Sequence, residues 1–150
     1  MHRPIHHRSF SHASPSCAPS QLANNDMADA GLVGLLRTLR QPSVAPKLRY
    51  LGLAQNRIAD AGAAALADHL VSAATPKLEH LELRENAIGD AGAEELARAL
   101  PCARRLRHLS LYHNAIGRQG ARALALALAQ APSLQALDLR LNLMEEGELR

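Results

Sequence analysis

The chain has 150 residues, a mass of 16.1 kDa and a formal net charge of +3 at pH 7. This is the size of one domain, and the charge is too small to indicate a nucleic-acid partner by itself. No apolar run approaches the roughly 20 residues of a membrane-spanning helix, so no membrane segment is expected. There are 29 Ala and 27 Leu but no Trp, one Phe and two Tyr, a composition that favours stacked helices or repeats.

Residues 1–20 differ in composition from the rest of the chain. They carry four His and five Ser, are interrupted by three Pro, and precede the first acidic residue, Asp26. So little apolar surface cannot offset the entropy of ordering, which predicts a disordered leader followed by a domain over residues 21–150. The segment lacks the apolar stretch of a secretory signal, and its prolines oppose the helix of a transit peptide, although a targeting role stays open. Its histidines could hold a soft metal loosely, but an accidental His-rich leader is the simpler interpretation.

Cysteine usage and the absence of common motifs exclude several classes of protein. Cys17 and Cys102 lie far apart in unlike surroundings, which predicts free thiols in a reducing compartment and hence a cytoplasmic location. The sequence contains no CxxC, HExxH, GxxxxGK[ST] or GxSxG motif. No cofactor and no enzymatic activity are therefore expected.

A repeat fills the body of the chain. Its four clear copies are LRYLGLAQNRIADAG (48–62), LEHLELRENAIGDAG (78–92), LRHLSLYHNAIGRQG (106–120) and LQALDLRLNLMEEG (134–147). The first Leu of successive copies is separated by 30, 28 and 28 residues. A degenerate copy precedes them, and since Cys17 and Ser20 replace its first two Leu, its strand is predicted to be poor or absent. The matching positions that it keeps are Leu22, Asn25, Met27 and Gly31.

The spacing within each copy predicts a short strand. Alternate leucines, such as Leu51 and Leu53, share one strand face and point inward. One repeat cannot bury that face alone, but stacked repeats form a continuous core. An Asn ends each strand, where its amide can donate to and accept from backbone groups of the bend. The predicted structural ladder is Asn56, Asn86, Asn114 and Asn142.

A helix is predicted to follow each strand. Asp60 and Asp90 occupy expected N-cap positions, whereas Arg118 replaces the Asp of the next copy, which predicts that its helix lacks a cap. A Gly in each first turn predicts close backbone packing, and prolines mark the helix ends. The expected helices are 28–39, 61–72, 91–100 and 119–129.

The motif LxxLxLxxNxI with a period near 28 resembles the leucine-rich repeat family. The NxIxDAGAxxLAxxL continuation is similar to its ribonuclease-inhibitor-like subtype, found also in NOD-like receptors and Ran GTPase-activating proteins. The resemblance implies an α/β solenoid with a short parallel β-sheet on the concave side and α-helices on the convex side. It further implies a non-enzymatic module that binds a protein partner through the concave sheet. A GTPase-activating protein of the Ran activator type and a truncated NOD-like-receptor sensing region stay as alternatives.

Side chains at the outward strand positions form one contiguous surface, because neighbouring parallel strands lie about 4.8 Å apart. This surface is the candidate binding face. Both tyrosines of the chain fall there, and Tyr and Arg commonly anchor protein interfaces. The predicted partner-binding residues are Tyr50, His80, Glu82, Arg84, His108, Tyr112, His113, Asp138 and Arg140.

Other chemistries at this face are not favoured. His80, His108 and Glu82 lack the fourth ligand of a structural zinc site, so no metal is expected. Side chains standing parallel on a sheet form no oxyanion hole, and the scattered arginines lack stacking platforms for nucleic acid. No capping repeat is visible, which predicts exposed apolar ends through which the chain could self-associate.

Overall fold

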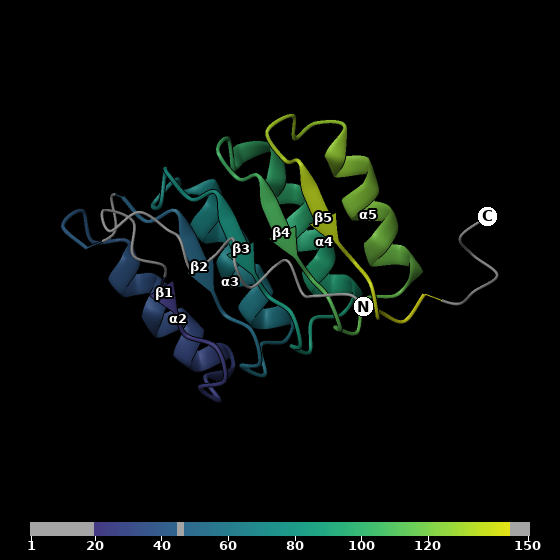
Figure 1. The fold of residues 1–150 in the computed structure, drawn as a ribbon, viewed down its shortest axis with the longest axis horizontal. Helices are drawn as coiled ribbons and strands as arrows, with labels where there is room; N and C mark the ends of the chain where they lie inside the picture. The colour runs from purple at the N-terminus through teal and green to yellow at the C-terminus, as the bar shows by residue number, and fades with distance from the viewer. Residues whose placement is uncertain (1–19, 45–46, 145–150) are drawn as a thin grey trace, which may run out of the picture.

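The computed structural model describes residues 20–44 and 47–144. The leader prediction for residues 1–19, including Cys17, lies outside the described residues. Strands and helices alternate along the chain, and the five strands form one parallel sheet in the order β1-β2-β3-β4-β5 (Figure 1). The elements are β1 (Ser20–Gln21), α2 (Ala28–Leu39), β2 (Tyr50–Gly52), α3 (Asp60–Val71), β3 (His80–Glu82), α4 (Asp90–Ala99), η2 (Leu100–Cys102), β4 (His108–Ser110), α5 (Arg118–Leu128) and β5 (Ala136–Asp138).

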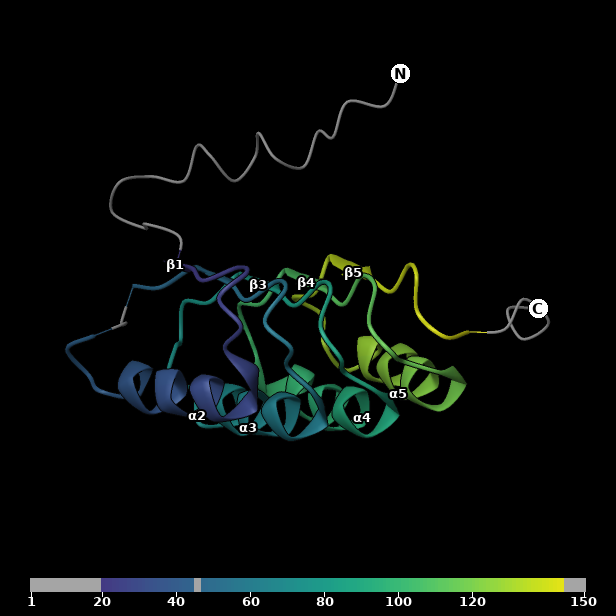
Figure 2. The same ribbon diagram turned by 90° about the horizontal axis from the view of Figure 1, so that it is seen from below.

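The molecule has two layers, with the sheet on one side and the helices on the other (Figure 2). The predicted solenoid fold, with the strands on the concave side, is confirmed. β1 is present but only two residues long, which agrees with the loss of its Leu positions. Within the described residues, no helix is long and apolar enough to cross a membrane.

Stacking sets the register of the sheet. Leu51 pairs with Leu81, Leu81 with Leu109 and Leu109 with Leu137, so equivalent residues of successive repeats lie side by side. The inward leucines of the three inner strands are at most 2% exposed. Together with the buried leucines of the helices they form one continuous apolar core, which is the burial that a single repeat cannot achieve.

Each Asn after a strand bonds to the backbone of its own repeat and of the preceding one. The Asn86 Oδ1 accepts from the amides of Asn56 and Ile58 at 3.0 and 2.9 Å. Its Nδ2 donates to the carbonyls of Leu53 and Leu83 at 3.0 and 2.9 Å. Asn56, Asn114 and Asn142 repeat this arrangement, so one side chain per repeat satisfies buried backbone groups at the bend.

The helix caps differ from the prediction. Asp60 and Asp90 are the first residues of α3 and α4, whose N-cap residues are Ala59 and Gly89. The Asp60 Oδ1 accepts from the amides of Gly89 and Gly92, at 2.7 and 2.9 Å, and so caps the helix of the next repeat. The Asp is thus the first residue of each helix, so α3 and α4 begin one residue earlier than predicted. They also end one residue earlier.

The same capping between repeats corrects the prediction for α5. Asp90 Oδ1 accepts from the amides of Gly117 and Gly120, at 2.8 and 2.7 Å, so α5 keeps a carboxylate cap although its own first residue is Arg118. The carboxylate lies one repeat upstream of the helix that it stabilises.

Apolar side chains are exposed at the α5–β5 end of the solenoid. The inner repeats bury the positions equivalent to Leu128, namely Leu70 at 5% and Leu100 at 2%. Self-association through this end stays a prediction. The exposed leucines are Leu126 at 65%, Leu128 at 41%, Leu141 at 61% and Leu143 at 66%.

His69 fills the interior beneath the longer loop of the 30-residue repeat. Its side chain is fully buried, and its Nε2 lies 3.2 Å from the Thr75 Oγ1. Its Nδ1 has no hydrogen-bond partner among the described residues. Burial, and secondarily the charge of Arg40, lowers the pKa of His69 from its usual 6.5.

We expect the free energy of unfolding to fall as the pH drops below about 6.5. The unfolded chain takes up a proton at the ordinary His pKa of 6.5, while the folded state resists protonation until a lower pH, so acid favours unfolding. His80, whose pKa is also lowered, contributes in the same direction. Urea unfolding at pH 7.5 and 5.5 should show a smaller loss of midpoint for His69→Gln than for the wild type. Equal losses would contradict the assignment to His69.

Candidate protein-binding face

The strand register aligns the outward residues in rows across the sheet. Tyr50, His80 and His108 lie side by side in the first row, and Gly52, Glu82, Ser110 and Asp138 form the second. Arg84, Tyr112 and Arg140 follow at the strand ends. Eight of the nine predicted partner-binding residues, all except His113, thus lie at outward strand positions or directly after them, and seven of the nine form two clusters.

The first cluster is a row of rings at the beginning of the strands. The imidazoles of His80 and His108 stack with centroids 4.4 Å apart and planes at 5°. The Tyr50 ring is tilted against His80 at 6.3 Å. It lies over Gly52, since a Cβ added there would be 2.9 Å from the Tyr50 Cε1. Gly52 thus provides the space in which Tyr50 packs against the sheet.

Packing in this row affects ionisation. Burial lowers the pKa of His80, and the neighbouring His108 lowers it further. Burial also raises the pKa of Tyr50, with a second contribution from Glu82. The row is therefore a partly buried aromatic surface, bordered by the carboxylate of Glu82.

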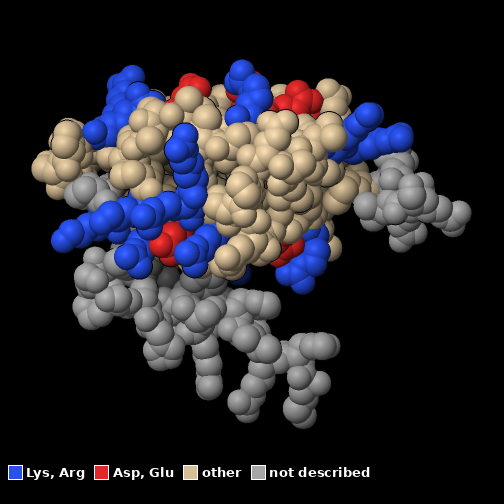
Figure 3. Space-filling view, turned by 90° about the horizontal axis from the view of Figure 1, so that it is seen from above, with Lys and Arg blue, Asp and Glu red and all other residues tan. Residues whose placement is uncertain are grey.

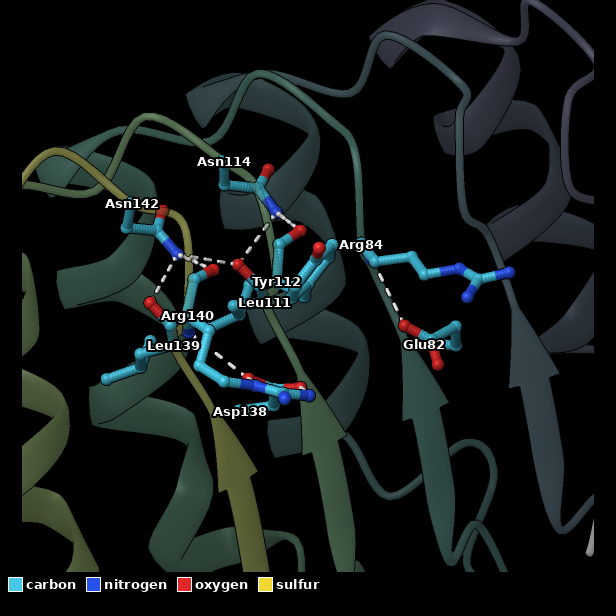
Figure 4. A network of polar contacts seen from close by, with 9 residues as sticks. All are labelled: Glu82, Arg84, Leu111, Tyr112, Asn114, Asp138, Leu139, Arg140 and Asn142. Carbon is cyan, nitrogen blue, oxygen red and sulfur yellow. Dashed lines mark hydrogen bonds and ion pairs between the residues drawn. The ribbon is translucent and has the colours of Figure 1, made fainter. Parts of the chain in front are cut away.

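The second cluster surrounds Tyr112 (Figure 4). Asp138 accepts two hydrogen bonds from the Arg140 guanidinium, Nε to Oδ1 at 2.9 Å and Nη2 to Oδ2 at 2.7 Å. The same guanidinium carbon lies 5.5 Å from the Tyr112 ring centroid, and His113 meets Tyr112 edge-on at 6.2 Å. The bond to Asp138 raises the pKa of Arg140. Arg140 is thus held in one orientation while its side chain stays 71% exposed.

Glu82 and Arg84 lie between the two clusters. Glu82 Oε1 accepts from the backbone amide of Arg84 at 3.3 Å rather than from its guanidinium. The Arg84 side chain extends towards β2, away from Tyr112 (Figure 4). Its Nε is buried and has no hydrogen-bond partner among the described residues. Arg84 therefore differs from Arg140, although both follow an acidic residue by two positions.

One polar pair at this face is not among the predicted partner-binding residues. Gln55 Nε2 donates to Glu85 Oε2 at 2.8 Å. Both residues, like His113 and Leu141, have φ of 54° to 56° and immediately precede a ladder Asn. The chain leaves the β conformation there, so strand alternation does not indicate where these side chains lie. Their shared position in the repeat was the available signal.

Metal-ligating side chains do not converge in residues 22–44 and 47–144. No group of three or more His, Cys, Asp and Glu there could hold a metal ion. Cys102 is exposed and free. The face presents hydrogen-bonding and aromatic groups on a parallel sheet, an arrangement suited to contact with another surface.

Comparisons with known proteins agree with this architecture. A family model described as "Leucine Rich repeat" matches residues 44–67, 75–97 and 104–125. No curated protein matches the sequence. A solved structure of "Leiomodin-1 Actin-Binding Site 2 (ABS2)" is similar with a TM-score of 0.72 and 23% identity, over 87% of this chain and 75% of that chain. At that identity the similarity concerns the fold. The three matched segments each contain one of the strands β2, β3 and β4 and most of the helix that follows it, so these units of the chain are similar to leucine-rich repeats.

Proposed function

We propose that this chain is a non-enzymatic interaction module that binds a protein partner through the concave face of its sheet. The observation that carries the proposal is the Tyr112 cluster, in which Asp138 orients an exposed Arg140 beside an aromatic ring. Orienting the side chain in advance lowers the entropy lost on binding. Tyr and Arg are also the residues most often found at the centre of protein interfaces.

The ring row extends the same surface to the other end of the strands. Tyr50, His80 and His108 are only partly exposed and already packed against one another. Aromatic groups held in this way offer apolar contact area at low entropic cost. The repeat period near 28 further supports a ribonuclease-inhibitor-like arrangement of the array.

A variant with Arg84→Glu and Tyr112→Ala should lose partner capture while staying folded. The changes reverse a charge and remove a central ring on the proposed face, and neither side chain belongs to the apolar core. The measurement is capture from a lysate with a photo-cross-linker placed at Ser110. A cross-linked protein seen with the wild type should be absent with the variant.

The matched control is Arg98→Glu with Leu126→Ala, two exposed positions on α4 and α5. It makes the same kinds of change on the convex side, so capture should be retained. Capture lost equally by both variants, or retained by a folded concave variant, would contradict the proposal. The similar leiomodin-1 structure is named for an actin-binding site, so actin is the first purified partner to test by co-sedimentation.

A further inference from the structure

Positive charge gathers on one edge of the solenoid, along the loops that enter β2, β3 and β4. Three consecutive loops, over residues 41–49, 72–79 and 101–107, carry six exposed cations and a single acid, Glu79. We call these cations the basic edge. They are Lys47, Arg49, Lys77, Arg104, Arg105 and Arg107.

Figure 3 looks onto this edge and shows more Lys and Arg atoms on its left half than on its right, with small acidic patches among them. At the opposite edge, where strands lead into helices, the charges are mixed. Arg57 there is paired with Asp26 at 2.8 Å. The carboxylates of three other residues accept hydrogen bonds from amides at helix N-termini, namely Asp29, Asp60 and Asp90. The net charge of +3 thus understates how basic one edge is.

The backbone of the basic edge is fixed by the sheet. The Arg49 carbonyl accepts from the amides of Glu79 and His80, at 2.8 and 2.9 Å, and the Glu79 carbonyl accepts from those of Arg107 and His108. Arg49, Glu79 and Arg107 therefore lie on adjacent rungs, and the two arginines are about 10 Å apart at the usual strand spacing. An extended peptide covers that distance in about three residues.

Glu79 offsets only part of this charge, because it is one acid among six cations. Its carboxylate pairs with Arg49, at 3.9 Å from the Nε, and its side chain is 18% exposed. The arginines outnumber the lysines by four to two along the edge. Guanidinium groups bind carboxylates through two parallel hydrogen bonds, so this composition suits a carboxylate-bearing ligand.

We propose that the basic edge binds an acidic, extended peptide segment of the protein that occupies the concave face. The inference rests on the proposed function for the nature of the partner. The ring row directly follows the basic edge along the strands, since His80 comes after Glu79 and His108 after Arg107. A partner lying over the ring row therefore meets the basic edge at its rim.

The edge suits a peptide better than nucleic acid or membrane. Single-stranded bases stack on exposed aromatic side chains, whereas the Tyr50 ring, next to Arg49 in the sequence, lies against the sheet over Gly52. Among the large apolar side chains exposed in the described residues, only Val44 belongs to these three loops. One valine offers too little apolar surface to insert into a bilayer.

The test is fluorescence anisotropy with a labelled twelve-residue peptide of alternating Glu and Ser, titrated with the purified full chain at low salt. We expect Lys77→Glu with Arg105→Glu to weaken binding at least tenfold. The matched control, Arg98→Glu with Arg122→Glu, makes the same change in net charge on the helices and should weaken binding less than threefold. Both pairs are exposed, and circular dichroism checks that each variant is folded.

Several outcomes would overturn the inference. They are no binding of the acidic peptide, equal loss in both variants, or tighter binding of a twelve-nucleotide single-stranded DNA or of phosphatidylserine vesicles through the same two residues. The Arg84→Glu, Tyr112→Ala variant should retain the peptide, and its loss would place the peptide on the concave face instead. The assay needs no natural partner, so failure of concave-face capture and failure of peptide binding are separate results.

Discussion

Asn86→Ala should lower the free energy of unfolding by about 3–4 kcal/mol, because five hydrogen bonds to partly buried backbone groups are lost together. The amides of Asn56 and Ile58 lose their acceptor. The carbonyls of Leu53, Leu83 and Arg84 lose a donor. The cost falls on two repeats at once, since the side chain joins them. Urea unfolding followed by circular dichroism measures it.

Two further variants distinguish this effect from simple loss of a polar side chain. Gln55→Ala removes one exposed hydrogen bond and should change stability by less than about 0.5 kcal/mol. Asn142→Ala alters the last ladder residue, whose Oδ1 accepts from the Ile116 amide, whereas the Asn86 Oδ1 accepts from two amides, so the cost should be smaller than at Asn86. Equal midpoints for Asn86→Ala and Gln55→Ala would show that the ladder does not stabilise the fold.

The strands, their register and the inward leucines could be predicted from the sequence. Leu81 and Leu83 are separated by two positions and repeat at a fixed period, and both signals are local. A fixed period also requires equivalent residues to stack, so the pairing of Leu81 with Leu51 and Leu109 follows without further information. The degenerate first strand, shortened where Leu is missing, obeys the same rule.

The caps could not be predicted correctly because they depend on a contact between repeats. A rule based on sequence assigns Asp60 to the helix that it precedes, whereas Asp60 bonds to Gly89 and Gly92 of the following repeat. The partners are 29 and 32 residues away in the sequence, and only the stacking of one repeat on the next brings them into contact. The Arg118 substitution was misinterpreted for the same reason.

At the candidate face, the sequence predicted which residues share a side of the sheet but not how they are oriented. Glu82 and Arg84 have the same spacing as Asp138 and Arg140, yet only the second pair forms a bond between side chains. Tyr50 packs onto the sheet because its neighbour at position 52 is Gly. These differences depend on rotamers and on neighbouring strands, which alternation along one strand does not describe.

Replacing either of two helical glycines, Gly34 or Gly92, with alanine should change the free energy of unfolding in opposite directions. Gly34→Ala should stabilise the fold by about 0.5–1 kcal/mol, because alanine favours helices and the position is open. A Cβ added at Gly34 in α2 meets nothing within 4 Å. Gly92 in α4 is buried, and its added Cβ would lie 2.7 Å from the Asp60 Oδ1 and 2.9 Å from both the Ala63 Cβ and the Ile88 Cγ2.

Gly92→Ala should therefore destabilise the fold by about 1–3 kcal/mol, as overpacking does in well-packed interiors. The Asp60 carboxylate could move aside, but only by lengthening its bonds to the Gly89 and Gly92 amides, and the methyl groups of Ala63 and Ile88 leave no room on the other side. Urea midpoints of the two variants should thus move in opposite directions from the wild type. A Gly92→Ala protein as stable as Gly34→Ala would mean that the repeats stack less closely than the inter-repeat caps require.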